Sequence, residues 1–305
     1  MSLWRHPNRR TSSELPTSLR RTSVPGDVRA WAGRSAGAKV VGVRRMPGAS
    51  STAVHELRLD DGRALVLRRY VWTGFLEDEP DAPEREVAAL TYAAGRELPV
   101  PAIVAADPRG VEVGDSIPAI LMTRLRGRAH PDPDPEALAA IAAEIHRPGG
   151  GAFDHDYIPW CRDTSTRPPR ACRNREQWAA ALEIWRSAEP RYEPRFIHRD
   201  FHPGNVLWFR GRLGGVVDWA NACIGPPGID VATCRWNLAD WAGSAAADAF
   251  VSAYEHRSGK PHDPYWDIAK IVEDDWDVID DPERVAQAET FLAAAMRHWL
   301  ERNGR

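Results

Sequence analysis

Residues 196–220 read FIHRDFHPGNVLWFRGRLGGVVDWA, and this stretch decides the fold. It holds two apolar runs, Val206 to Phe209 and Leu213 to Val217, which Arg210-Gly211-Arg212 separates. Short apolar runs joined by a glycine-containing turn predict a β-hairpin. A polar loop precedes this hairpin and Asp218 ends it, so we expect the polar groups of both segments at one edge of a sheet.

The polar groups of this stretch have the spacing of a phosphoryl-transfer site. Asn205 follows Asp200 by five residues, and the strand-borne Asp218 follows Asn205 by thirteen. Carboxylate and amide oxygens can hold Mg²⁺ against nucleotide phosphates, while a further carboxylate engages the acceptor hydroxyl. The spacing matches the catalytic and metal loops of kinases.

Two segments carry a family resemblance. HRDFHPGNVLW (198–208) and GVVDWANACIGPPGIDVA (215–232) resemble the aminoglycoside phosphotransferase and choline kinase superfamily, with Arg199 where that family usually has glycine. The likeness extends over nearly all of residues 38–300. It implies an α+β, two-lobed, protein-kinase-like fold: a small antiparallel sheet with one helix as N-lobe and a larger, mainly helical C-lobe.

The resemblance also implies roles for individual residues. Asp200 is the catalytic residue that orients or deprotonates the acceptor hydroxyl, and Asn205 and Asp218 ligate Mg²⁺. Glu86 matches the helix glutamate that pairs with a phosphate-binding lysine, and the lysine position is occupied by Arg68. Arginine can bridge phosphate and carboxylate, but its planar fork is not equivalent to the point charge of lysine.

The nucleotide, ATP or GTP, has two further predicted contacts. Residues 48–52 occupy the place of the phosphate-covering loop, and the run Met122-Thr123-Arg124-Leu125 resembles the hinge that meets adenine through its backbone. Asp230 resembles the aspartate that braces the catalytic loop. The predicted nucleotide-binding residues of the loop and hinge are Ser50, Ser51, Thr52, Thr123, Arg124 and Leu125.

The remaining pattern predicts a tail and two lobes. Residues 1–37 form an N-terminal tail, 38–125 the nucleotide-binding N-lobe, and 126–305 the C-lobe with the catalytic loop and acceptor site. The N-lobe strands are predicted at 39–43, 53–59, 64–70, 103–105 and 117–124, with a helix over 83–92. Helices of the C-lobe are predicted at 135–146, 175–187, 229–241, 245–254 and 282–303.

Composition excludes several other chemistries. The chain has 305 residues, a net charge of −3, and only three lysines among its 40 basic residues. The one Gly-Lys pair, Gly259-Lys260, runs into Pro261, so a phosphate-binding P-loop is excluded. No lysine lies in an obviously apolar stretch, which argues against Schiff-base or pyridoxal chemistry.

The N-terminal 29 residues are locally basic, and we interpret them as a tail, with a DNA-binding arm as the alternative. Neither an apolar signal core nor an apolar run of 18 residues occurs, so we expect a cytoplasmic protein with no membrane or nucleic-acid partner. The four cysteines form no CxxC pair, which favours reduced, buried thiols.

Each assigned residue also has a simpler interpretation. His198 is expected to brace the loop rather than act as a base, and His198-x-Asp200-x-His202 lacks the longer pattern of zinc hydrolases. Arg68 and Glu86 could be surface residues, and Ser50 to Thr52 an ordinary turn. The acids between Glu273 and Asp281 form a solvated face or receive a cationic acceptor. Six tryptophans are assigned to core or cleft lining: Trp160, Trp178, Trp185, Trp219, Trp236 and Trp241.

The sequence thus predicts an ATP- or GTP-dependent O-phosphotransferase that moves the γ-phosphate to a hydroxyl of a small molecule. Aminoglycosides, other antibiotics, choline-like amino alcohols and sugars stay open as acceptors. A nucleotide-binding pseudoenzyme is the alternative from another class. A protein kinase is disfavoured because only eleven residues separate Asp218 from Asp230, too few for an activation segment.

Overall fold

The computed structural model describes residues 23–46, 51–130, 132–149, 152–159, 167–274, 276 and 281–304, which divide into two compact units. The sheet unit contains the described residues up to Arg128 together with Val206–Ala222. The helical unit contains Ala129–Asn205 and the described residues from Cys223 onward. The hairpin that ends in Asp218 therefore belongs to the sheet unit, although the sequence interpretation assigns 126–305 to one lobe.

The sheet unit is built on five antiparallel strands in the order β1-β2-β3-β5-β4. Their bounds are β1 Val40–Arg45, β2 Ala53–Leu59, β3 Ala64–Arg69, β4 Ile103–Asp107 and β5 Ala119–Thr123. The turn between β2 and β3 closes where predicted: the Leu59 N–H donates to the Arg63 carbonyl at 2.9 Å. Gly62 has a φ of 86°, the left-handed region that glycine adopts at little cost.

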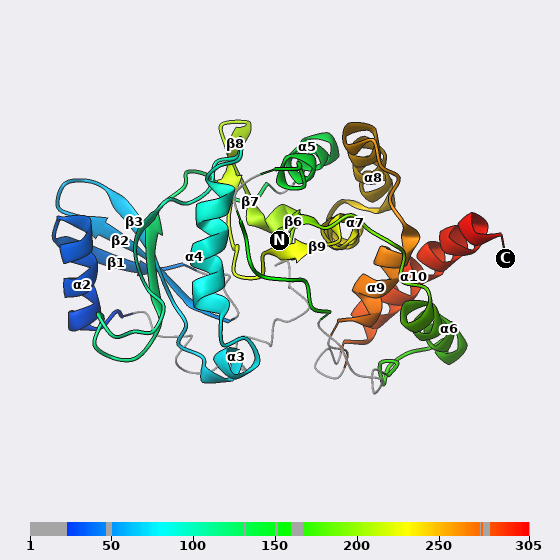
Figure 1. Ribbon diagram of the computed structural model, residues 1–305, viewed down its shortest axis with the longest axis horizontal. Coiled ribbons are helices and arrows are strands. Elements are labelled where there is room, and N and C mark those ends of the chain that lie inside the picture. The colour runs from blue at the N-terminus through cyan, green and yellow to red at the C-terminus, as the bar shows by residue number, and fades with distance from the viewer. Residues whose placement is uncertain are drawn as a thin grey trace. The chain divides into compact units, whose positions relative to one another are not determined.

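Two faces of the sheet are covered by different helices, α2 (Gly26–Ala36) and α4 (Ala82–Ala93) (Figure 1). On the α2 face, Val28, Trp31 and Ala32 pack against buried leucines that alternate along the strands. Those leucines are Leu57, Leu59, Leu65, Leu67 and Leu121.

The interpretation of residues 1–37 as a tail is wrong for 26–36. Helix α2 buries Val28 and Trp31 to 0% and 3% exposure, so it is part of the sheet unit's core. The prediction fails because only Val28, Trp31 and Ala32 are buried in an otherwise polar and small-residue helix, at the i, i+3, i+4 spacing of a helix face. A short helix, α3 (Thr73–Asp78), is also absent from the predicted pattern, and residues 1–22 lie outside the described residues.

The hairpin of residues 206–216, β7 (Val206–Phe209) and β8 (Arg212–Val216), is held against the segment that precedes β4. The Val216 N–H donates to the Pro99 carbonyl at 2.9 Å. Gly215 has a φ of 144°, and a Cβ there would lie 2.5 Å from the same carbonyl. Glycine is therefore required where the strand leading to Asp218 approaches this backbone.

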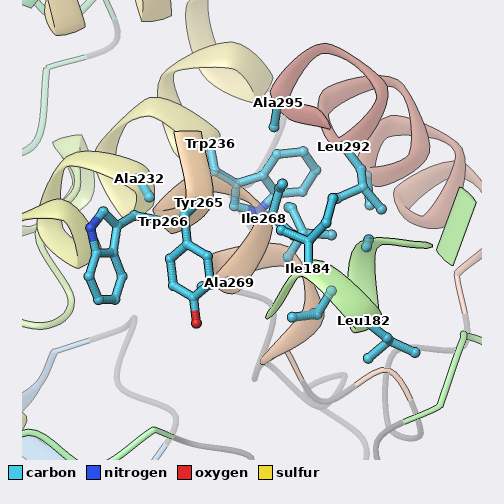
Figure 2. Packing of buried hydrophobic residues seen from close by; sticks show 14 of the residues in the cluster. Leu182, Ile184, Ala232, Trp236, Tyr265, Trp266, Ile268, Ala269, Leu292 and Ala295 are labelled. Carbon is cyan, nitrogen blue, oxygen red and sulfur yellow. The ribbon is translucent and has the colours of Figure 1, made fainter. Parts of the chain in front are cut away.

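The helical unit packs helices α6, α7, α9 and α10 around buried aromatic residues. Trp178 and Trp236 are 1% and 2% exposed, which confirms their assignment to the core. Figure 2 shows Trp236 of α7 beside Ile268 of α9 and Ala295 of α10. The elements are α5 Pro135–Ile145, α6 Arg175–Ser187, β6 Arg195–Ile197, the 3₁₀ turn η1 Pro203–Asn205, β9 Cys223–Gly225, α7 Pro227–Ala242, α8 Ser244–Ser258, α9 Pro264–Val272 and α10 Pro282–Asn303.

The described part of the chain adds two findings. Cys172, Cys223 and Cys234 are free thiols, the last two buried, while Cys161 lies outside the described residues. A search of the described helices finds none with the length and apolarity that a membrane crossing requires.

Candidate active site

The predicted catalytic loop runs from the end of β6 to η1 in the helical unit and brings Asp200 and Asn205 together. The Asn205 side-chain Nδ2 donates to the backbone carbonyl of Asp200 at 3.0 Å. Because Nδ2 makes this bond, Oδ1 is the amide atom with which Asn205 can ligate a cation. The Asp200 N–H points to Nδ1 of His198 at 3.3 Å, and His198 is fully buried, as expected for a residue that braces the loop.

One buried carboxylate, Asp230 at the start of α7, holds the loop by hydrogen bonds to its backbone. It accepts the backbone N–H groups of His198 and Arg199 at 2.7 and 2.6 Å. Its Oδ2 also lies 3.0 Å from Nε2 of His146, whose Nδ1 is 2.8 Å from the Tyr254 hydroxyl. Asp230 is 0% exposed, so each of these partners offsets the cost of burying the carboxylate.

Arg199 has a φ of 66°, which explains why glycine suits this position of the family motif. A side chain in the left-handed region costs roughly 1–2 kcal/mol. Two contacts offset this cost: the guanidinium donates to the Ile158 carbonyl and lies 5.4 Å from the centre of the Tyr157 ring. Arg199 is buried, and hydrogen bonds hold both its backbone N–H and its side chain.

Tyr157 connects this loop to Glu273, a buried acid at the end of α9. The tyrosine hydroxyl donates to Glu273 Oε2 at 3.2 Å, and the Trp185 indole N–H donates to Oε1 at 3.0 Å. Burial raises the pKa of Glu273 to about 7, although both hydrogen bonds act in the opposite direction. Glu273 is thus an internal carboxylate and not part of an exposed acidic face.

The other acids of that run have structural partners or lie outside the described residues. Asp274 is buried and paired with Lys270. Asp281 caps α10 by accepting the Glu283 N–H at 3.0 Å. Asp275, Asp277 and Asp280 lie outside the described residues. No exposed acidic patch for a cationic acceptor is found among the acids of this run that the structure describes.

In the sheet unit, Arg68, Glu86 and Asp218 form one ionic cluster. Arg68 Nη1 lies 3.1 Å from Glu86 Oε1 and 2.7 Å from Asp218 Oδ1. The Tyr70 hydroxyl donates to Glu86 Oε2 at 2.5 Å. Burial alone would lower the pKa of Arg68, but Asp218 and Glu86 outweigh it, so the guanidinium stays charged. The predicted pairing of Arg68 with Glu86 is present in the structure.

Strand alternation explains which arginine enters this cluster. Arg68 and Arg69 are adjacent on β3, so their side chains leave the sheet on opposite faces. Arg68 meets Glu86 of α4, whereas Arg69 Nη2 pairs with Asp115 at 2.5 Å.

Asp218 combines a strained backbone with an accessible carboxylate. Its φ is 71°, rare for a residue with a side chain, and its side chain is 40% exposed, against 2% for Glu86. The hard oxygen ligands of Asp218 and Asn205 fit the chemistry of Mg²⁺. No three His, Cys, Asp or Glu side chains gather as metal ligands in the part of the chain that the structure describes.

The predicted hinge begins in the last residues of β5, and only part of its backbone is available to a nucleotide base. Thr123 uses its N–H and Oγ1 to bond the Ala102 backbone, at 2.8 and 2.9 Å. Arg124 is tied by Nε to Glu56 Oε2 at 2.5 Å. A hydrogen bond from Arg44 lowers the pKa of Glu56, which therefore holds Arg124 as a carboxylate. The backbones of Arg124 and Leu125 are left as the hinge candidates.

The predicted phosphate-covering loop is described only at its end. Ser50 lies outside the described residues, Ser51 is partly exposed, and Thr52 is 1% exposed. The Thr52 hydroxyl is therefore directed into the protein in this structure.

Sequence reasoning missed four residues of the site. Tyr70 could have been found, because it lies two positions after Arg68 and so on the same face of β3. Arg85 neighbours Glu86 and is buried, but a lone arginine on an acid-rich helix start reads as a surface charge. Glu56 and His146 carry no local signal, since their partners Arg124 and Asp230 are distant in sequence.

Comparisons with known proteins agree with this geometry. Residues 42–262, well over half of the chain, match the model of the phosphotransferase enzyme family, APH. A homoserine kinase of Methylobacillus flagellatus is 29% identical over 246 residues, which cover 77% of this chain and 72% of that protein.

Solved structures share the fold. Aminoglycoside phosphotransferase APH(4)-Ia, in a ternary complex with ADP and hygromycin B, has a TM-score of 0.56 at 19% identity, covering 89% of this chain and 98% of that one. A putative fructosamine-3-kinase from Thermobifida fusca has a TM-score of 0.57 at 18% identity, covering 88% and 98%. The fold is therefore the two-lobed protein-kinase-like fold. The chain belongs to the phosphotransferase enzyme family.

Proposed function

We propose that the protein transfers the γ-phosphate of ATP, or of GTP, to a hydroxyl group of a small molecule in the cytoplasm. The observation that carries this proposal is the loop at Asp200, where Asn205 bonds the Asp200 backbone and Asp230 holds the two preceding N–H groups. Rigid placement of this carboxylate is what in-line phosphoryl transfer needs, because most of its catalysis is positioning.

Each element of the site has a proposed role. Asp200 accepts the proton of the acceptor hydroxyl or orients it toward the donor phosphate. Asn205 and Asp218 hold Mg²⁺, which when bound neutralises charge on the donor phosphates. Arg68, fixed by Glu86, contacts the phosphates, and the backbones of Arg124 and Leu125 contact the base.

The names of similar proteins, and not an exposed site of this chain, support the proposed acceptor class. The similar proteins are named for homoserine, an aminoglycoside and fructosamine, which are all hydroxylated amines. We therefore propose a hydroxylated amine as the acceptor, a class that includes choline-type amino alcohols, with sugars as the next class. Glu273 and Asp274 are buried and do not supply an exposed anionic surface for it.

A panel assay tests this proposal. Purified protein with Mg²⁺ and either ATP or GTP is incubated with homoserine, hygromycin B, fructosamine, choline and simple sugars, and a phosphorylated product is sought by mass spectrometry. We expect one class to give a product with its mass raised by one phosphoryl group, and none with the Asp200→Ala variant. Nucleotide binding without product for every acceptor would argue against the proposal.

A nucleotide-binding pseudoenzyme is the second candidate, and one observation favours it. Arg68 Nη1 lies 2.7 Å from Asp218 Oδ1, so the arginine already pairs with one of the carboxylate oxygens proposed to bind the cation. Calorimetry with ADP in the presence and absence of Mg²⁺ separates the two functions. A phosphotransferase is expected to bind ADP more tightly with Mg²⁺, whereas a pseudoenzyme that uses Arg68 in place of the cation would not.

A further inference from the structure

Arg85, which the proposed mechanism does not use, lies buried beside the cluster at Asp218. Its side chain is 8% exposed, and its guanidinium has three described partners. Nε donates to the backbone carbonyl of Ala220 at 2.7 Å, Nη2 pairs with Glu79 at 2.7 Å, and Nη1 pairs with Asp81 at 3.2 Å. The two acids stand in the segment that leads into α4, so they neutralise the buried charge locally.

The bond to Ala220 reaches the segment that carries Asp218. Ala220 follows Asp218 by two residues, and Trp219 between them is fully buried, with its indole N–H donating to the Val216 carbonyl at 3.0 Å. Two hydrogen bonds thus hold the segment, one from the Trp219 indole and one from the Arg85 guanidinium.

Two consecutive residues of α4 therefore constrain the Asp218 segment, one indirectly and one directly. Glu86 acts through Arg68, which touches the Asp218 carboxylate, and Arg85 acts on the backbone just beyond it. The two routes constrain different atoms: the first is an ion pair with the side chain, and the second is a hydrogen bond to the main chain.

The backbone of Asp218 gives the second route its importance. Its φ of 71° is uncommon for a residue with a side chain, so neighbouring contacts help to keep the segment in this conformation. If the Ala220 carbonyl loses its donor, we expect the segment to relax and the Asp218 carboxylate to move.

We propose that Arg85 is a positioning residue that fixes the Asp218 carboxylate for cation and phosphate binding by anchoring the Ala220 backbone to α4. This rests on the proposed function only in taking Asp218 as a cation ligand. Partners that orient a metal ligand typically change metal affinity by about 10–100-fold when they are removed.

Two variants of Arg85 and one control test the proposal. Arg85→Lys keeps a positive charge between Glu79 and Asp81 but lacks the Nε donor for Ala220. Arg85→Met removes both the charge and the donor. The matched control is Glu84→Gln, which changes an exposed residue of the same helix.

ADP affinity is measured by calorimetry in EDTA and over a series of Mg²⁺ concentrations, with thermal unfolding of each variant. We expect Arg85→Lys to bind ADP in EDTA like the wild type but to need about tenfold more Mg²⁺ for the same tightening. Arg85→Met should need at least as much, and Glu84→Gln no more than the wild type.

A lower melting temperature with an unchanged Mg²⁺ requirement in Arg85→Lys would overturn the proposal, because it would show a purely structural role. Arg85→Lys decides the matter if Arg85→Met does not fold. A wild type whose ADP affinity ignores Mg²⁺ would instead contradict the proposed function, and the role of Arg85 with it, before any variant is compared.

Discussion

The loop at Asp200 and the segment at Asp218 are proposed to carry complementary parts of the chemistry, and different interactions hold them. In the helical unit, Asp230 is a buried carboxylate that receives backbone N–H groups, and its bonds are fixed by the chain itself. In the sheet unit, Asp218 is half-exposed and its carboxylate rests on an ion pair with Arg68. An ion pair can exchange partners when a cation or phosphate arrives, whereas a backbone bond keeps one geometry. The comparison teaches that the backbone around the proposed base is preset, whereas the Asp218 carboxylate, on a backbone that Arg85 anchors, can exchange its partner and is therefore adjustable.

The largest effect is expected when the preset side loses its support. Asp230→Ala leaves two backbone N–H groups and His146 buried without their acceptor, which should lower the free energy of unfolding by about 4 kcal/mol. Urea unfolding measures this loss. The matched control is Asp240→Ala on the same helix, whose carboxylate is 25% exposed and pairs with Arg284, and which should cost less than about 1 kcal/mol. Equal losses in both variants would show that Asp230 supports the loop no more strongly than a partly exposed ion pair does.

The pH dependence of stability tests whether Glu273, in the helical unit, titrates near neutral pH. Its pKa of about 7 in the folded protein lies above the ordinary value of 4.5, so between these pH values the unfolded chain releases a proton that the folded chain keeps. The wild type should therefore lose about 3 kcal/mol of stability as the pH rises from 4.5 through 7, and Glu273→Gln should not. Urea unfolding of both proteins at pH 5 and pH 8 gives the comparison. A difference between them that is the same at both pH values would show that Glu273 does not titrate in this range.

The groups that face Glu273 do not reverse this sign. Tyr157 and Trp185 donate hydrogen bonds to it, and Arg199 and Lys270 lower its pKa at longer range, yet burial outweighs all four. Burial also raises the pKa of Tyr157, and Glu273 adds to that rise, so the tyrosine stays neutral over the tested range.

The adjustable side is tested at Arg68. Arg68→Lys keeps the charge, and a single nitrogen, Nη1, makes both present contacts, so the pairing with Glu86 can persist. The shorter lysine lacks the planar, bidentate guanidinium that could bind phosphate while it stays paired with the two carboxylates. We expect ADP affinity in Mg²⁺ to fall about tenfold, or about 1.4 kcal/mol, with little change in stability. Unchanged affinity would mean that the guanidinium fork has no part in binding nucleotide.

The smallest effect concerns the backbone of the preset loop. Arg199→Gly and Arg199→Ala both remove the contacts with Ile158 and Tyr157, but only alanine keeps the cost of a φ of 66°. The glycine variant should therefore be more stable than the alanine variant by about 1 kcal/mol. Thermal or urea unfolding of the two variants measures this. The reverse order would show that the loop leaves the left-handed conformation when the arginine is removed.

Local pattern was sufficient for much of the fold. The alternation in Ala53–Leu59 and the Asp-Asp-Gly turn predicted β2 with the observed bounds and β3 to within a residue. The proline-led runs predicted α5 and α10 to within a residue. These elements combine a clear period with a strong start or stop signal. Helix α2 has neither a strong period nor an apolar composition, and its place in the core is decided by tertiary packing of Trp31.

The candidate site divides in the same way. The Asp200, Asn205 and Asp218 spacing identified the segments, but not the interactions that hold them. Arg68 was paired with Glu86 only through the family resemblance, and Asp218 and Tyr70 joined that cluster only in three dimensions. The positive φ values of Arg199 and Asp218 could not be expected, because a residue with a side chain is rarely found there.

The account depends most directly on Asp200, and one pair of measurements tests it. ADP affinity with Mg²⁺ and phosphoryl transfer to the acceptor found in the panel are compared between the wild type and Asp200→Ala. Because Asp200 is proposed to engage the acceptor and not the nucleotide, ADP affinity should stay within about twofold while transfer falls by at least about a thousandfold. Wild-type turnover in Asp200→Ala would contradict the central claim that this loop carries the chemistry.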